Sequence, residues 1–102
     1  MRENDLHNAF IAFLDKANIA YIHSNTHKRS STTPGDPDFV LLKNGHNMSL
    51  EFKMIGNKQS DKQIKRQKAI EAAHNVYYIA FDVETAVDLT NEWIRRERII
   101  QL

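Results

Sequence analysis

The spacing of apolar residues along the chain predicts three helices and four strands. Helices are expected at Asn4–Ala17, Asp61–Ala73 and Asp82–Arg98, where apolar side chains recur every three or four positions. Strands are expected at 19–23, on either side of the Asn44-Gly45 pair, and at 76–81, whose apolar run is typical of a strand buried on both faces. The order α-β-β-β-α-β-α predicts an α/β fold with a mixed sheet flanked by helices, in a single domain covering residues 1–102.

Residues at the ends and on the faces of these helices refine the prediction. Asn18 is expected to end the first helix, and Ser60 is a good N-cap for the second. The second helix carries a modest apolar stripe of Ile64, Ile70 and Ala73. The third helix has a broader apolar surface, which we expect to pack on the sheet of its own chain and which is also the candidate interface of a homodimer.

The segment from Gly35 to Lys53 is predicted to form a β-hairpin. Asn44 and Gly45 lie between two apolar runs, and both tolerate the positive φ that a type I′ turn requires. With these two residues at the centre of the turn, cross-strand partners lie symmetrically about it. This register pairs Leu42 with Asn47, Val40 with Ser49 and Asp38 with Glu51.

The two faces of this hairpin differ in chemistry. Side chains alternate between faces along a strand, which places a uniformly apolar set on one face: Phe39, Leu41, Met48, Leu50 and Phe52. Asp38, Glu51 and Lys53 fall on the other face. Like charges on directly paired strand residues destabilise a sheet, so a cation is expected to bind between Asp38 and Glu51. The alternative is a solvated face that carries ordinary charges.

Composition limits the class of protein. The hydrophobic fraction of 41% and the charged fraction of 26% are those of an ordinary globular domain. No apolar run approaches the ~20 residues that a membrane helix requires, and the N-terminus lacks the apolar core of a signal peptide. The absence of cysteine excludes disulfides and thiolate zinc sites. We therefore expect a cytoplasmic protein, and a phage-encoded protein in a bacterial host fits this expectation.

The net charge of +1 conceals an uneven distribution of charge. Between Lys28 and Lys68 nine basic residues face four acidic ones, whereas the remainder of the chain is acidic. A positive field around the Asp38–Glu51 segment would attract polyphosphate in a salt-sensitive way. The candidate phosphate contacts are Lys28, Arg29, Lys58, Lys62, Lys65 and Arg66. The alternative for each is a solvated basic surface.

Two carboxylates followed by a lysine suit a hard divalent cation held by oxygen ligands. Mg²⁺ is commonly held by one or two carboxylates together with water and substrate phosphate. Lys53 shares the strand face of Glu51, so its ammonium could reach an attacking water or a phosphate oxygen. This set suits metal-assisted hydrolysis of a phosphodiester.

Pro37-Asp38 followed by Glu51-Phe52-Lys53 resembles the signature of PD-(D/E)xK nucleases. With Gly35, and with Ser60-Asp61-Lys62-Gln63 at a helix start, the chain resembles the VRR-Nuc branch, the virus-type replication–repair nucleases, from Glu3 to about Phe81. The resemblance implies a restriction-endonuclease-like fold and a Mg²⁺ or Mn²⁺ ion. Met54-Ile55 departs from the Arg-Pro that many relatives carry there, which puts local DNA contacts in question.

The resemblance also implies roles for individual residues. Asp38, Glu51 and the backbone carbonyl of Phe52 would hold the metal, and Lys53 would orient the nucleophile or stabilise charge in the transition state. Glu3 and Gln63 would support the site. The alternative for Glu3 is a favourable charge at a helix N-terminus, and for Gln63 simple exposure. His7, one turn after Glu3, is a weaker candidate.

Histidine and the segment before the hairpin offer further candidates. His23, His27 and His46 invite a zinc site, but no helical His-x-x-x-His motif makes them converge. Residues 24–34 are rich in Ser, Thr, Asn and basic side chains, which predicts a loop or an irregular strand end. This segment could contact DNA phosphates through Lys28 and Arg29, or could be a disordered surface loop.

The sequence therefore predicts a metal-dependent DNA endonuclease. Relatives by resemblance look like homodimers that cut branched DNA such as four-way (Holliday) junctions, and a two-fold dimer would present two equivalent sites. The main alternative is a nucleic-acid-binding module without catalysis. An RNA nuclease, or a domain acting within a larger complex, is a third option.

Overall fold

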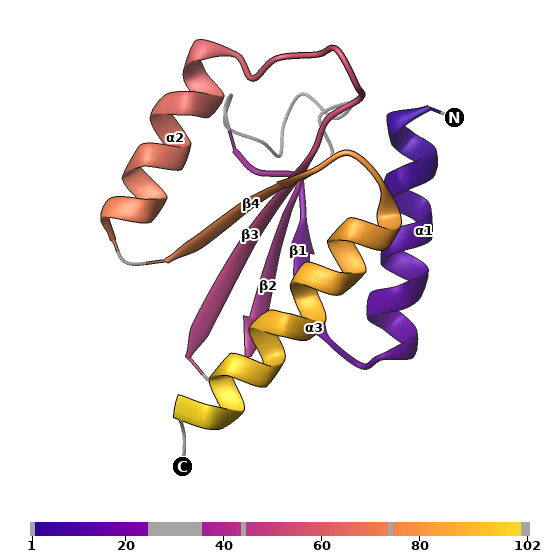
Figure 1. Ribbon diagram of the computed structural model, residues 1–102, viewed down its shortest axis with the longest axis vertical. Coiled ribbons are helices and arrows are strands. Elements are labelled where there is room, and N and C mark those ends of the chain that lie inside the picture. Colours follow the sequence, from indigo (N-terminus) through magenta and orange to yellow (C-terminus); the bar gives the residue numbers. More distant parts are fainter. Residues whose placement is uncertain (1, 25–35, 44, 74, 101–102) are drawn as a thin grey trace.

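The computed structural model describes residues 2–24, 36–43, 45–73 and 75–100, with side chains described up to Arg96. Three helices and four strands follow one another along this chain (Figure 1). They are α1 (Glu3–Lys16), β1 (Ala20–His23), β2 (Phe39–Lys43), β3 (His46–Phe52), α2 (Asp61–Ala72), β4 (Val76–Ala80) and α3 (Val83–Ile100). The element boundaries lie within one or two residues of those predicted from the periodicity.

The described strands form one mixed sheet in the order β1-β2-β3-β4. The β1–β2 and β2–β3 pairs are antiparallel, whereas β3 and β4 run parallel because α2 connects them as a crossover. Helices α1 and α3 pack against one face of the sheet and against each other. Helix α2 lies on the opposite face, near β4. The predicted α/β class with a mixed sheet is confirmed.

The predicted hairpin register is confirmed from Phe39–Leu50 to Lys43–His46, whereas the predicted pair Asp38–Glu51 lies one step beyond the end of the ladder. Leu42 pairs with Asn47 and Val40 pairs with Ser49. Gly45 has a φ of +82°, which suits the position of a tight turn, although Asn44 lies outside the described residues. The five residues assigned to the apolar face are all fully buried: Phe39, Leu41, Met48, Leu50 and Phe52.

The core lies between this face and the two helices that cover it. Leu6, Phe10 and Leu14 of α1 are buried against the sheet, and α3 contributes Ala86 and Trp93. The Phe10 ring meets those of Phe39 and Phe52 edge-on, at centroid distances of 5.0 and 5.5 Å. The expectation that the last helix packs on its own sheet is confirmed.

The opposite face of the sheet is only partly covered. No residue of α2 is fully buried, and Ile64 is 38% exposed, so the modest apolar stripe of this helix adds no fully buried residue to the core. At the other side of the face Ile22 of β1 is 57% exposed. The prediction that 76–81 is buried on both faces also fails in part, because β4 is an edge strand of the described sheet in which only Tyr77 and Ala80 are buried.

Local hydrogen bonds define the helix ends that matter for the site. The first helix ends where Asn18 adopts a left-handed φ of 58°, as its position in the sequence predicted. At the start of α2 the Ser60 hydroxyl accepts a hydrogen bond from the Gln63 backbone N–H, and the Gln63 side chain accepts one from the Ser60 N–H. This reciprocal pair is a capping box, which fixes the direction in which α2 leaves the preceding loop.

No described helix combines the length and the apolar character needed to cross a membrane.

Candidate functional site

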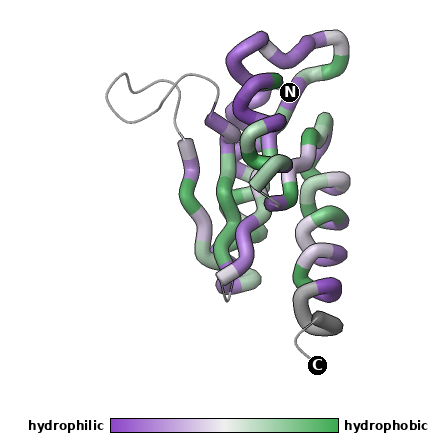
Figure 2. The backbone as a smooth tube through the Cα atoms, turned by 90° about the vertical axis from the view of Figure 1, so that its left-hand side faces the viewer, coloured by the Kyte–Doolittle hydropathy of each residue, from purple (hydrophilic) through white to green (hydrophobic). Residues whose placement is uncertain are grey.

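The candidate site lies at one end of the sheet, where four elements begin or end. The start of α1, the residues before β2, the end of β3 and the loop that leads into α2 come together there (upper part of Figure 1). Hydrophilic residues gather at this end of the molecule, as Figure 2 shows around the N-terminus. Loops and the ends of strands and helices leave backbone groups and polar side chains accessible, while the sheet holds them in fixed positions.

Asp38 is held at this end by a backbone donor. Its Oδ2 accepts a hydrogen bond of 2.8 Å from the N–H of Phe52, and its side chain is only 8% exposed. Continued along the hairpin, the register would bring Phe52 opposite Pro37, but the ladder stops at Phe39. The Asp38 carboxylate thus takes the N–H that the strand ladder leaves without a backbone partner.

Glu51 is the most unusual residue of the site, because its carboxyl group is completely buried. Its Oε1 accepts a hydrogen bond of 3.1 Å from the Tyr77 hydroxyl, while its Oε2 has no hydrogen-bond partner of good geometry. Burial raises the pKa of Glu51 above its ordinary value of 4.5. The nearby Lys53 ammonium counteracts this rise, as do polar interactions with Tyr77 and with the side chain of Gln59.

The charge of Asp38 acts on two neighbouring groups, Glu51 and Tyr77. The negative charge of Asp38 raises the pKa of Glu51, as a smaller contribution than burial. It also raises the pKa of Tyr77, which burial and Glu51 together hold well above the ordinary value of 10.0. Tyr77 therefore stays protonated and donates to Glu51. We refer to Asp38 and Glu51 as the carboxylate pair.

A second group adjoins the carboxylate pair and shares Asp38 with it. One ligand atom each from Glu3, His7 and Asp38 lies within 4.8 Å of the others, and we refer to these three residues as the histidine cluster. The Nε2 of His7 is 3.4 Å from Asp38 Oδ2 and 3.7 Å from Glu3 Oε1. No hydrogen-bond partner of good geometry reaches this buried nitrogen.

The other nitrogen of the His7 ring is engaged. His7 Nδ1 and His23 Nε2 form a hydrogen bond of 2.9 Å, and the His23 ring stacks on Phe39 at a centroid distance of 4.5 Å. Burial lowers the pKa of His23, and the neighbouring His7 lowers it further, against an opposite effect of Asp38. The sequence analysis treats His7 as a weaker candidate and considers His23 together with His27 and His46. His46 lies at the far end of β3, paired with Lys43, and His27 is outside the described residues.

The structure brings together most of the residues that the sequence nominated. Asp38, Glu51, Phe52 and Lys53 lie at one end of the β2–β3 hairpin, and Glu3 approaches Asp38 from α1. Gln63 is different, because its side-chain oxygen accepts from the Ser60 N–H in the capping box. The amide that interacts with Glu51 belongs instead to Gln59, four residues earlier, in the loop before α2.

The sequence analysis missed Gln59 and Tyr77. Gln59 donates from Nε2 to Gln67 Oε1 at 3.0 Å, which orients its amide across the first turn of α2. Tyr77, on β4, is paired with Ser49 of β3. Ser49 is two residues from Glu51 along β3, so Tyr77 lies on the same face of the sheet as Glu51. Knowledge of the register between β3 and β4 would have placed Tyr77 near Glu51. A helix connects these two strands, however, so no short turn fixes their register in the sequence.

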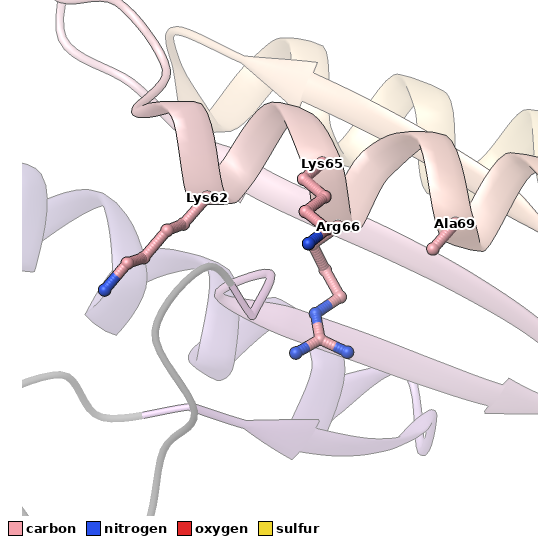
Figure 3. A pocket seen from close by; sticks show the side chains of 4 residues that line it. All are labelled: Lys62, Lys65, Arg66 and Ala69. Carbon is pink, nitrogen blue, oxygen red and sulfur yellow. The ribbon is translucent and has the colours of Figure 1, made fainter.

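Basic side chains of α2 line a cavity next to the site. Lys62, Lys65, Arg66 and Ala69 surround about 310 Å³ (Figure 3). Arg66 also contacts Asp36, with its Nε 3.4 Å from Oδ1, and lines a second cavity of about 350 Å³ over the open face of the sheet. Lys58 is exposed in the loop before α2, whereas Lys28 and Arg29 lie outside the described residues.

Comparisons of the chain with models of protein families, with curated proteins and with solved structures find no match. The chemistry of the site is therefore argued from its own geometry. Glu51 Oε2 and His7 Nε2 are both buried without a hydrogen-bond partner, and His7 Nε2 lies 3.4 Å from Asp38 Oδ2. They are two of only three buried side-chain polar atoms without a hydrogen-bond partner among the described residues, the third being Trp93 Nε1. Buried polar atoms are normally satisfied, so the two unpartnered atoms beside Asp38 are the feature of this end of the sheet that calls for an explanation.

Proposed function

We propose that this protein is a metal-dependent endonuclease that hydrolyses phosphodiester bonds in DNA. The observation that carries the proposal is the buried Glu51 carboxylate, which keeps one oxygen without a partner beside Asp38. A buried carboxylate oxygen without a partner costs free energy, and a cation bound between Glu51 and Asp38 would supply that partner. The ordered residues of the PD-(D/E)xK signature support the same assignment, and with it the restriction-endonuclease-like fold.

The donor set fits a hard divalent cation. Asp38, Glu51 and the backbone carbonyl of Phe52 would hold Mg²⁺ or Mn²⁺ through oxygen atoms, the ligands that these ions prefer. When bound, the ion would supply Lewis acidity to the scissile phosphate and favour ionisation of an attacking water. The hydrogen bond from Tyr77 orients Glu51 so that its free Oε2, rather than Oε1, is the oxygen offered to the ion.

Lys53 supplies positive charge to the same place. The Lys53 ammonium lowers the pKa of Glu51, which supports a place for its charge beside that carboxylate. The backbone N–H of Lys53 donates to the Ala80 carbonyl at 3.0 Å, which anchors the residue as it leaves β3. In the proposed reaction Lys53 positions the attacking water and stabilises negative charge that develops on the phosphate.

The basic face of α2 supplies the DNA contacts. Lys62, Lys65 and Arg66 line one cavity, and Lys58 precedes them in the loop. Contacts of this kind position the nucleic acid through its phosphates without reading its sequence. We infer that the enzyme selects DNA by shape, with branched DNA such as four-way junctions as its substrate and a homodimer as the acting unit.

The experiment compares Asp38→Ala and Glu51→Gln with wild type on duplex, flap, fork and four-way DNA, with Mg²⁺ or Mn²⁺ and with EDTA. We expect wild type to cleave only with metal, and both variants to lose cleavage while they keep the far-UV circular dichroism of wild type. The matched control is Glu71→Gln, which removes a carboxylate from an exposed position on α2. Full metal-dependent cleavage by either site variant would refute the assignment.

A binding module without catalysis is the second candidate. The basic cavity favours it, because Lys62, Lys65 and Arg66 could hold phosphate without the carboxylate pair. The two functions separate in one assay on branched DNA. Binding that never yields a Mn²⁺- or Mg²⁺-dependent product would favour the module.

A further inference from the structure

We propose that the histidine cluster is a second metal position, which takes a first-row transition-metal ion such as Zn²⁺ in preference to Mg²⁺. It would bind the ion through His7 Nε2 and one oxygen each of Glu3 and Asp38. The inference extends the proposed metal site through the shared Asp38. Its tests measure metal binding and not cleavage, so it can fail or succeed apart from the nuclease assignment.

The distances in the cluster suit a metal ion better than a hydrogen bond. Charge-assisted N–H···O⁻ bonds are about 2.7–2.9 Å long. The separations of 3.4 and 3.7 Å from His7 Nε2 to Asp38 and Glu3 exceed that range. Two ligand atoms that each lie about 2.1 Å from a tetrahedral metal are about 3.4 Å apart. The separations of both carboxylate oxygens from His7 Nε2 are therefore close to those of a ligand set, and the two oxygens lie within 4.8 Å of each other.

The orientation of His7 supplies an independent argument. Its Nε2 is buried without a hydrogen-bond partner and faces two carboxylate oxygens. In the tautomer with the ring hydrogen on Nδ1, the Nε2 lone pair faces both carboxylates and is repelled by them unless a cation lies among them. For Nε2 to be the ligand, Nδ1 must carry the ring hydrogen, and Nδ1 is the atom that meets His23 Nε2 at 2.9 Å.

His23 is thus a positioning residue for His7. Metal-binding imidazoles commonly donate their second N–H to a neighbouring acceptor, which fixes both the tautomer and the ring plane. His23 fills this role from β1, and its stacking on Phe39 holds its own ring in place. The His7 ring also packs against Phe39 and Phe52, at centroid distances of 5.3 and 5.5 Å. These contacts make the position rigid before any ion binds.

The nitrogen ligand determines which ion is preferred. Mg²⁺ favours oxygen ligands and retains several waters, whereas imidazole suits zinc and other transition-metal ions. Three protein ligands of the N,O,O type leave a fourth coordination position open, as in catalytic zinc sites. The carboxylate pair, with oxygen donors only, is the position suited to Mg²⁺.

The test follows Zn²⁺ and Mg²⁺ binding by calorimetry, and the histidine ring nitrogens by ¹H–¹⁵N NMR, in the whole wild-type protein. We expect saturating Zn²⁺ to shift the His7 Nε2 resonance while Nδ1 keeps its hydrogen. His7→Gln and Glu3→Gln should each weaken Zn²⁺ binding at least about tenfold, and His7→Gln should leave Mg²⁺ binding unchanged. The matched control, His46→Gln, removes an exposed imidazole from the far end of β3 and should leave Zn²⁺ binding as in wild type.

Glu51→Gln separates the two positions. This variant should lose Mg²⁺ binding and keep the Zn²⁺-induced shift at His7. An unmoved His7 Nε2 in wild type would overturn the inference, whether or not any variant folds. So would equal Zn²⁺ affinity of His7→Gln and wild type, or loss of the His7 shift in Glu51→Gln, which would mean one shared position. Absence of DNA cleavage with an intact His7 shift would count against the nuclease alone.

Discussion

Glu51→Gln should make the metal-free protein more stable at neutral pH, although it removes a proposed metal ligand. In wild type the carboxyl group is fully buried, Oε2 lacks a hydrogen-bond partner, and burial raises the pKa of the group. Glutamine has nearly the same shape, and its side-chain oxygen can still accept the hydrogen bond from Tyr77. The substitution therefore removes the buried charge and keeps the packing.

The magnitude follows from the cost of that charge. Each pKa unit corresponds to 1.36 kcal/mol between the two protonation states, so a raised pKa measures the cost of holding Glu51 ionised in the folded protein. We expect Glu51→Gln to raise the free energy of unfolding by about 1–2 kcal/mol at pH 8. For a domain of this size the melting temperature should rise by about 4–8 °C per kcal/mol.

The pH dependence has a definite sign. A carboxyl group whose pKa is raised on folding contributes its stability fully below its unfolded pKa, near the ordinary value of 4.5, and loses it as the pH rises through the folded pKa. The advantage of Glu51→Gln over wild type should therefore vanish near pH 4 and grow toward pH 8. Glu71→Gln, at an exposed position, should show no such pH-dependent difference.

Urea unfolding in EDTA at several pH values measures this difference. Saturating Mg²⁺ should then reverse the ranking, because an ion that binds only the folded state stabilises it by about 2.7 kcal/mol at one hundred times its Kd. Wild type should gain this stability and Glu51→Gln should not. The reasoning is refuted if the variant is less stable than wild type in EDTA at pH 8, or if the difference between them is the same at pH 4.

Three further predictions concern the surroundings of the site. Tyr77→Phe removes the donor to Glu51 and should cost about 1–3 kcal/mol in urea unfolding at pH 8, with a smaller cost at pH 4; equal costs at the two pH values would indicate packing alone. Gln63→Ala breaks the capping box and should lower the free energy of unfolding by at most about 1 kcal/mol, while calorimetry shows Mg²⁺ affinity as in wild type; a large loss of Mg²⁺ affinity would restore Gln63 to the site. The double substitution of Lys62 and Lys65 by alanine should reduce the slope of log K for duplex DNA against log salt by about 1–2, measured by fluorescence anisotropy, and an unchanged slope would remove α2 from the DNA interface.

The hairpin could be predicted from sequence because a turn determines its register locally. Once Asn44 and Gly45 are placed at the turn, the faces of Phe39, Leu41 and Glu51 follow from alternation alone. The same logic identified Asp38 and Glu51 as neighbours across the end of the hairpin. It could not give the orientation of the Asp38 side chain, which depends on where the ladder stops and which N–H is left over.

The remainder of the site depends on contacts between elements that are distant in the chain. His7 and His23 meet because α1 crosses the end of β1, and Tyr77 reaches Glu51 because β4 pairs in parallel with β3. Neither distance is set by a short-range pattern. Gln63 matched a family position, yet in this structure its side chain caps α2 and Gln59 interacts with Glu51. Sequence position alone does not distinguish two amides four residues apart.

The bond between the Phe52 amide and the Asp38 carboxylate joins residues on either side of the whole hairpin. A slip of one residue between β2 and β3 would turn Phe52 outward, bring Glu51 into the apolar layer and leave Asp38 without its anchor. Correct zippering of the hairpin and assembly of the cation ligands are consequently a single event. If the proposed function holds, a copy of the chain with a slipped hairpin would lack the metal ligands and the nuclease activity together.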